Sequence, residues 1–252
     1  MSERASQQAV YMNTRPLMSF GGLAVRRMAF AVIAVVLLGW GVIELRKPDT
    51  LPIKKIHALG SFVKVDEAML RTVTAKVLDG GYFAVNVSEV QRAVESLAWI
   101  HSASVSRIWP DTISINVVEE QATAVWAKGG LVNQQGAIII PFEESYPVGL
   151  PVFDGPVGME RNMTEFYKKA KEVIEPLGLD ITNLTLDSRG AYVLELSNDI
   201  DLLLGREHIQ SRLERFARVY KKVLVKRAAE IARIDMRYSN GLAVGWRKLN
   251  KG

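Results

Sequence analysis

Residues 102–118 read SASVSRIWPDTISINVV and contain two runs in which apolar and polar side chains alternate. Alternation with a period of two is typical of a half-buried β-strand, because successive side chains of a strand point to opposite faces. The runs Ser102–Ile108 and Thr112–Val118 are separated by Trp109-Pro110-Asp111, where proline presets the backbone for a turn. These residues therefore predict a β-hairpin.

A first helix is predicted upstream of this hairpin, over residues 65–78. Asp66 is placed to cap its N-terminus, and Gly80-Gly81 follows its last apolar residue and ends it. The apolar residues expected on its inner face are Met69, Leu70, Val73 and Val77.

A second helix is predicted to begin at Ser88, which forms a capping box with Gln91. A strand at Ile53–Leu59 precedes both helices. The order strand, helix, helix, strand, strand predicts a small α+β domain over residues 53–121, in which two helices pack on one face of a three-stranded sheet.

The pattern after residue 121 changes to short apolar runs and predicts a second, mixed β-rich domain over residues 122–252. The expected strands in its first part are residues 123–127, 131–132, 137–140, 181–186, 192–196 and 200–204. One helix is expected at Asn162–Leu177, with Asn162 and Glu165 as a capping pair, and a longer one at Glu207–Lys226. The basic residues expected on the outer face of the longer helix are Arg212, Arg215, Arg218, Lys221 and Lys222. This face either binds an acidic partner or is simply solvated.

The last predicted element is a hairpin, with strands at Ala229–Tyr238 and Leu242–Leu249 joined by Ser239-Asn240-Gly241. Asn-Gly is a strong signal for a tight hairpin turn, because both residues tolerate positive φ. The second strand is expected to be an open sheet edge, which a partner strand extends by β-augmentation. Aromatic and arginine side chains of the types found at binding hot spots lie here, at Arg237, Tyr238 and Trp246. The alternative is an edge strand with two core aromatics and no partner.

An uncharged run at residues 28–43, MAFAVIAVVLLGWGVI, predicts a single transmembrane helix. A cleavable signal peptide is the alternative, but no small-residue cleavage site follows the run. Residues 1–27 hold four arginines and one glutamate, so this tail carries +3 of the net charge of +5. The positive-inside rule predicts a cytoplasmic tail and export of everything after a juxtamembrane linker at residues 44–52.

The sequence holds no sign of a reactive centre. It has no cysteine, its three histidines have no metal-ligand spacing, and nucleotide-binding and nucleophile motifs are absent. The basic excess lies on the tail rather than on a folded domain, which argues against nucleic acid. We therefore predict that the protein is not an enzyme and has no cofactor, no metal and no small-molecule substrate.

Three segments resemble the FtsQ/DivIB family of cell division proteins. Trp109-Pro110-Asp111, with the alternating residues to Glu119 and then Ala124 and Trp126, is similar to the end of that family's POTRA domain. Residues 235–246, DMRYSNGLAVGW, are similar to its last hairpin, and residues 198–206 match an internal segment. Ala122 stands where the family usually has a proline.

This resemblance, closest to proteobacterial FtsQ, implies a POTRA domain and a scaffold without catalysis. It implies binding of the FtsB/FtsL pair through the last strand, contact with other divisome proteins through the POTRA domain, and a place in the inner membrane at the division septum with the bulk in the periplasm. The partner-binding residues expected are Arg189, Arg237, Tyr238, Ser239, Gly241, Val244 and Trp246. A membrane-anchored assembly factor for exported proteins and a periplasmic cell-wall enzyme are the alternatives.

Overall fold

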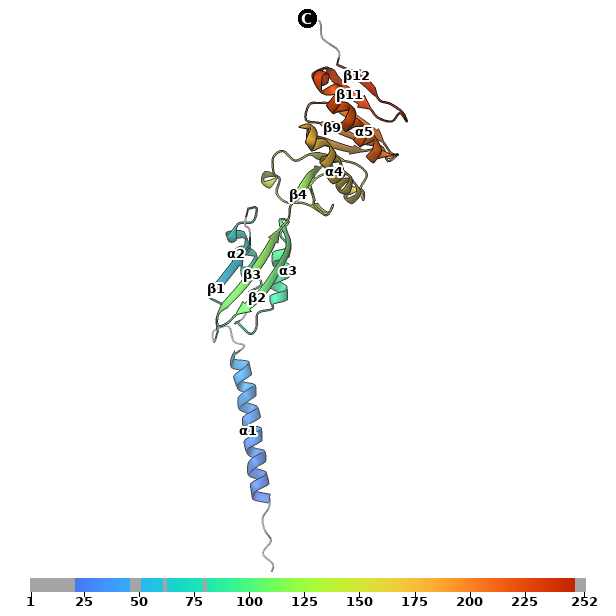
Figure 1. The fold of residues 1–252 in the computed structure, drawn as a ribbon. Coiled ribbons are helices and arrows are strands. Elements are labelled where there is room, and N and C mark those ends of the chain that lie inside the picture. The colour runs from blue at the N-terminus through green and yellow to red at the C-terminus, as the bar shows by residue number, and fades with distance from the viewer. Residues whose placement is uncertain (1–20, 46–50, 61–62, 79–80, 248–252) are drawn as a thin grey trace, which may run out of the picture. The chain divides into compact units, whose positions relative to one another are not determined.

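The computed structural model describes residues 21–45, 51–60, 63–78 and 81–247 (Figure 1). The chain divides into two compact units: α1 shares one with residues 51–52 and 81–85, and all other elements belong to the second. Of the predicted features, most of the basic tail, the middle of the linker, Gly80 and the end of the last strand lie outside the described residues. The predicted domain limits stay predictions.

The apolar helix α1 (Gly21–Leu45) is longer than the predicted segment 28–43. Its stretch Val25–Glu44, 20 residues, is long and apolar enough to cross a membrane. The helix includes Arg26 and Arg27, because arginine is a good helix former whose long side chain can reach a headgroup layer from inside a span. The charges that ended the predicted run therefore do not end the helix.

The first part of the second unit has the predicted βααββ order. Its elements are β1 (Lys55–Leu59), α2 (Glu67–Ala75), α3 (Val87–Glu95), β2 (Ile100–Ile108) and β3 (Thr112–Glu119). The strand order is β1-β3-β2, with β1 parallel and β2 antiparallel to β3. Ile113 and Ile115 of β3 are fully buried, and α3 packs on β2. The α+β prediction is confirmed for this part.

Two local predictions for these helices are wrong. Helix α3 is capped by Asn86, whose side chain accepts a hydrogen bond from the Ser88 N–H and donates one to Glu89. Asparagine is as good an N-cap as serine, and the helix begins before Ser88, so the Ser88 and Gln91 capping box does not form. In α2, Met69 is exposed; the helix buries Leu70 and Thr74. The Asp66 cap is confirmed.

The rest of the unit is built on a nine-stranded sheet with the order β12-β11-β10-β9-β8-β7-β4-β5-β6. Its strands are β4 (Ala122–Trp126), β5 (Leu131–Asn133), β6 (Ile138–Ile139), β7 (Val152–Asp154), β8 (Ile181–Leu186), β9 (Tyr192–Leu196), β10 (Asp201–Gly205), β11 (Ile231–Asp235) and β12 (Ala243–Trp246). Its helices are α4 (Glu160–Ile174) and α5 (Ile209–Lys222), with short 3₁₀ segments η1 (Glu143–Ser145), η2 (Glu175–Leu177) and η3 (Leu224–Glu230). Helix α4 packs on β8 and α5 on β10, over a core that includes Phe153, Leu194 and Phe216.

Three features of this sheet and its helices differ from the prediction. Strand β7 was not predicted; it pairs in parallel with β4 on one side and β8 on the other. Helix α4 begins at Glu160, after Met159, so Asn162 and Glu165 do not cap it. Helix α5 is shorter than the predicted 207–226, because His208 has a left-handed φ of 54° and the chain tightens into η3 after Val223.

Candidate partner-binding edge

Strand β12 is the terminal strand of the nine-stranded sheet, as the sequence predicts for an open edge. It pairs antiparallel with β11, and β11 pairs in parallel with β10. The register between β11 and β12 shifts after Ile231, which places Ile231, Ile234 and Met236 in the core and leaves Ala232 half-buried. Among the residues that the structure describes, no strand pairs with the outer side of β12.

The connection from β11 to β12 is not the predicted tight turn. The last paired residues are Asp235 and Ala243, so residues 236–242 form a seven-residue loop. Met236 still donates its N–H to the carbonyl of Leu203, at 2.9 Å, on the β10 side. Tyr238, which would be buried if it were one of two core aromatics, is 58% exposed.

Two arginines of α5 hold this loop. Arg215 donates Nη1 to the Ser239 carbonyl at 2.6 Å and Nη2 to the carbonyls of Tyr238 and Met236 at 2.8 and 3.1 Å. Arg212 donates to the carbonyls of Leu204 and Arg237 at 2.7 and 3.0 Å. The carbonyls of residues 236–239 lie beyond the end of the β11–β12 ladder, and that of Leu204 lies at an irregularity of β10, so they need donors from elsewhere. For Arg212 and Arg215, the prediction of a solvated face or a partner-binding face is therefore incomplete.

Arg237 and Arg189 line one surface hollow, although they are far apart in sequence. The other residues of this hollow include Asp187, Arg206, Glu207 and Arg212. The guanidinium group of Arg237 bonds both carboxylate oxygens of Asp235, and this bond lowers the pKa of the Asp235 carboxyl group. The hollow is thus lined by several arginine side chains, and it lies beside the loop that leads to β12.

The turn that carries Arg189 is also ordered by a carboxylate. Asp187 accepts hydrogen bonds from the backbone N–H groups of Ala191 and Arg189, each at 2.8 Å. Both bonds lower the pKa of the Asp187 carboxyl group, and the bond from Ala191 has the larger effect. The backbone at Arg189 is therefore fixed while its side chain remains on the surface.

Trp246, in the last strand, is 47% exposed, and Arg227 of η3 lies over its ring at 4.2 Å from the centroid. Arg227 also pairs with Glu230 at 2.6 Å. Arg247, which directly follows Trp246, donates hydrogen bonds to the carbonyls of Ile231 and Asn198. Two contacts thus hold the indole in place: the cation–π contact with Arg227, and the hydrogen bonds by which Arg247 fixes the chain just after Trp246.

The predicted site residues from Arg237 to Trp246 occupy the loop and β12, and Arg189 joins them through the hollow. Val244 is half-buried and packs against the core, Gly241 is half-buried, and the Ser239 carbonyl accepts from Arg215. The supporting roles of Arg212, Arg215 and Arg227 were not predicted from the sequence. Arg212 and Arg215 are three residues apart and lie next to buried residues of α5, and this spacing was a signal that could have indicated their supporting role.

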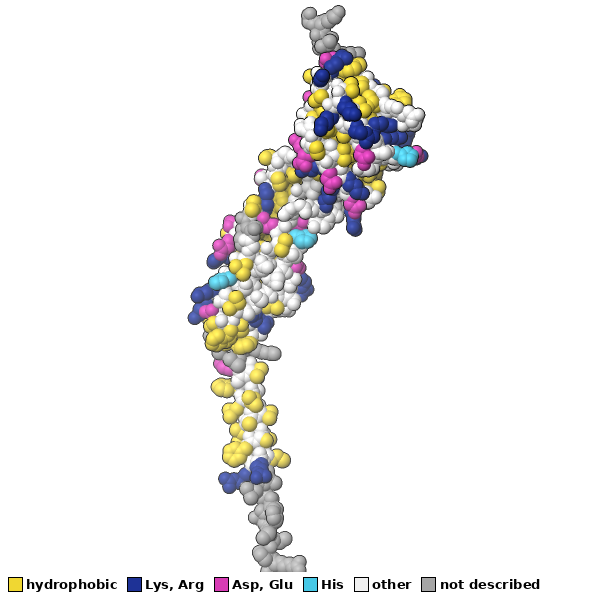
Figure 2. Space-filling view, in the orientation of Figure 1, with side chains coloured by type: hydrophobic (Ala, Val, Ile, Leu, Met, Phe, Trp, Pro, Cys, Tyr) yellow, Lys and Arg dark blue, Asp and Glu magenta, His cyan; other side chains and the backbone are white. Residues whose placement is uncertain are grey.

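Figure 2 shows Lys and Arg side chains gathered over the part of the molecule that carries α5, β11 and β12. Residues 206–247 contain eleven Lys and Arg against four Asp and Glu. Two of these arginines, Arg212 and Arg215, bond backbone carbonyls rather than carboxylates in the bonds described above. The candidate edge is therefore set in a basic surface.

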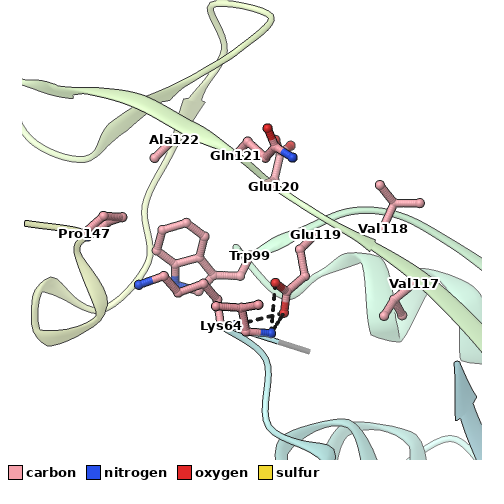
Figure 3. A pocket seen from close by; sticks show the side chains of 10 residues that line it. Lys64, Trp99, Val117, Val118, Glu119, Glu120, Gln121, Ala122 and Pro147 are labelled. Carbon is pink, nitrogen blue, oxygen red and sulfur yellow. Dashed lines mark hydrogen bonds between the residues drawn. The ribbon is translucent and has the colours of Figure 1, made fainter. Parts of the chain in front are cut away.

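A second hollow lies where β3 leads into β4 (Figure 3). The Glu119 carboxylate accepts from the N–H groups of residues 63–65 at 2.9 to 3.2 Å. Lys64 Nζ and Trp99 Nε1 both donate to Ser145, at 3.2 and 2.9 Å. These polar groups are engaged in structural hydrogen bonds. Within the described ranges, no group of three His, Asp or Glu residues is placed to hold a metal ion.

Comparison with known proteins gives the same organisation. Residues 51–120 match the FtsQ-type POTRA domain, and residues 124–237 match the C-terminal region of cell division protein FtsQ/DivIB. The chain is 36% identical to the cell division protein FtsQ of Coxiella burnetii over 217 residues, which are 86% of this chain and 89% of that protein. It is 33% identical to FtsQ of Xanthomonas campestris over 228 residues, 90% and 80% of the two chains.

An apolar helix long enough to span a membrane, a POTRA domain and a β-rich domain define a membrane-anchored POTRA protein. The chain belongs to the FtsQ/DivIB family of cell division proteins. It is thus a member of the division machinery, and its partners are other division proteins.

Proposed function

We propose that this protein is a non-enzymatic scaffold of the divisome, which binds the FtsB/FtsL pair through the free edge of β12 and recruits division proteins at the septum. The observation that carries this proposal is the terminal position of β12 in the nine-stranded sheet. A terminal strand offers backbone N–H and C=O groups to an extended segment of another chain. Added strands gain affinity from these groups and specificity from side-chain contacts.

The side chains around the edge support a binding role. Tyr238 and Trp246 are 58% and 47% exposed, one at each end of the segment that leads into and through β12. Exposed aromatic side chains of this kind are typical hot spots when a partner covers them. The hydrogen bonds from Arg215 and Arg212 hold the loop before the partner arrives, which lowers the entropy cost of binding.

The charge of the site favours an acidic segment of FtsB. Arg189 and Arg237 share one hollow, and Arg237 is already paired with Asp235. Arg189 is the side chain that we propose forms a salt bridge with an acidic residue of FtsB. Such a pair at the rim steers association and fixes the register of the added strand more than it adds affinity.

The proposed orientation follows from the arginines at the start of α1. Arg26 and Arg27 lie within two turns of its first residue, and two further arginines precede it in the sequence. The positive-inside rule then places the N-terminus in the cytoplasm and both sheets in the periplasm. The site has the arginines and aromatics of a binding surface, and the scaffold role needs no reactive group.

The test is a calorimetric titration of the full chain in lipid nanodiscs with the periplasmic segments of FtsB and FtsL. Tyr238→Ala and Trp246→Ala are each expected to weaken binding by about 2 kcal/mol, roughly 30-fold in Kd. Amide hydrogen exchange of residues 243–246 is expected to slow on binding, which reports strand addition directly.

Phe142→Ala is the matched control, because Phe142 is 76% exposed and follows β6 at the opposite end of the sheet. It should leave the affinity unchanged. The proposal is wrong if the native chain does not bind, or if binding occurs without slower exchange in β12.

A further inference from the structure

The turn between β2 and β3 exposes large apolar side chains. Ile108 is 48% exposed and Trp109 is 73% exposed, and Pro110 after them is exposed as well. Tryptophan is usually well buried in folded proteins. Here it adds little to the core of its own domain, and the proposed binding of FtsB does not use it.

This turn lies at the end of the three-stranded sheet where β1 begins. Strands β1 and β3 are parallel and begin together, with Lys55 paired to Thr112. The N–H groups of Lys54 and Lys55 both donate to the carbonyl of Asp111, at 2.9 and 3.4 Å. The first residues of β1 are thus bonded to the turn itself.

The covalent connection to α1 limits how far the turn can move from the membrane. Helix α1 ends at Leu45, and Lys54 follows nine residues later. Nine fully extended residues span at most about 30 Å. A weak membrane contact at this turn would therefore form at the high effective concentration of a short tether.

The chemistry of the turn fits a lipid headgroup layer. Tryptophan prefers the interface between hydrocarbon and water, where its ring is buried and its N–H stays hydrated. Lys54 and Lys55 are exposed, are bonded to the turn through their backbone, and would face anionic headgroups. The acid in the turn is Asp111, whose carboxylate accepts a hydrogen bond from the Thr112 hydroxyl.

We propose that the turn Ile108-Trp109-Pro110 inserts into the headgroup layer of the membrane that holds α1, with Lys54 and Lys55 against its anionic lipids. The inference rests on the span assigned to α1 in the proposed function. It gives the POTRA domain a second, non-covalent attachment to the bilayer, which restricts the directions in which the partner-binding sheet can be presented.

The experiment uses the full chain in nanodiscs of phosphatidylethanolamine and phosphatidylglycerol. Because the chain has no cysteine, Ser106→Cys provides a single labelling site two residues before Ile108. A fluorophore there is expected to be quenched by nitroxides on the lipid headgroups. Replacing Ile108 and Trp109 together by serine is expected to reduce this quenching several-fold, and Phe142→Ser should leave it unchanged.

Discs of phosphatidylcholine alone, and Lys54→Gln in the original discs, test the electrostatic part, and both should lower the quenching. Native quenching that is absent, or that survives the double substitution, overturns the proposal and would point to a protein partner for the turn instead. The same discs are titrated with the FtsB segment. Partner binding without quenching refutes lipid docking alone, and quenching without partner binding refutes the proposed partner alone.

Discussion

Arg215→Met tests whether the α5 arginines organise the loop of residues 236–242, which belongs to the proposed binding edge. The native side chain donates to three carbonyls, those of Met236, Tyr238 and Ser239. Methionine keeps the apolar part of the half-buried side chain, but it donates no hydrogen bond. The loop should then lose its order while the rest of the sheet remains folded.

The magnitude follows from the exposure of the three hydrogen bonds. The bond to Met236 is part-buried and should contribute about 1.5 kcal/mol, and the two exposed bonds about 0.5 kcal/mol each, because water can replace them. The Nε atom of Arg215 is buried without a hydrogen-bond partner, and methionine removes that cost. The net loss is about 2 kcal/mol, roughly 30-fold in the equilibrium between the ordered and disordered loop.

Two measurements check this prediction. Amide exchange in residues 236–242 should become faster, and calorimetry with the FtsB segment should show weaker binding. Arg215→Lys should restore only part of the effect, because one ammonium group does not match the planar fork that reaches three carbonyls. Arg218→Met, at an exposed position of the same helix, is the control. Unchanged exchange in the loop of the Arg215→Met variant would mean that Arg215 does not order this loop.

Three further predictions concern other residues of the second unit. Glu119→Ala removes the acceptor of three backbone N–H groups, and we expect a loss of about 2–3 kcal/mol, seen as faster exchange of those amides. Gly205→Ala should cost about 1–2 kcal/mol and lower the melting temperature, because the residue has φ of +72° and its new Cβ would lie 3.0 Å from a guanidinium nitrogen. Gly149→Ala, at φ of +78° in open space, should cost less. The hydrogen bond from Arg237 lowers the pKa of Asp235 in the folded protein. The stability that this pair adds should therefore be complete above the pKa of an unfolded aspartate, about 3.9, and should fall as the pH drops below it. Amide exchange of the loop measured against pH checks this.

The longer regular elements could be predicted because their patterns are local. Strands β2 and β3 alternate over enough residues to identify both strands and the turn between them. Strand β7 could not be found this way, because it has three residues and exists through its parallel partners β4 and β8. Those partners are distant in sequence or separated from it by a helix, so the residues of β7 alone do not indicate a strand.

Helix starts were harder to predict because several residues can serve as caps. Asn86 and Ser88 are both good N-cap residues, and the choice depends on which of them adopts the extended conformation. Helix α4 begins without a side-chain cap, so the Asn162 and Glu165 pattern misled the prediction. In that helix the buried Met163 and Ile174 identify the element, although not its first residue.

The candidate site could be predicted in part because most of its residues are consecutive. The segment from Arg237 to Trp246 was recognisable from its hairpin pattern. The tight Asn240-Gly241 turn was wrong because Arg215, on another element, supplies donors that stabilise a wider loop. No local pattern contains that interaction, since it joins residues more than twenty positions apart.

The position of β12 also determines when the proposed binding edge can exist. A ribosome makes the chain from its N-terminus, and β11 and β12 come after the other strands of their sheet. Until β11 has been made, the free edge at this end belongs to β10, and until β12 follows it belongs to β11. An interrupted chain would therefore show a different edge, with a different hydrogen-bond pattern, and lack Trp246. The proposed recognition of β12 would thus select for molecules in which this strand has already been made.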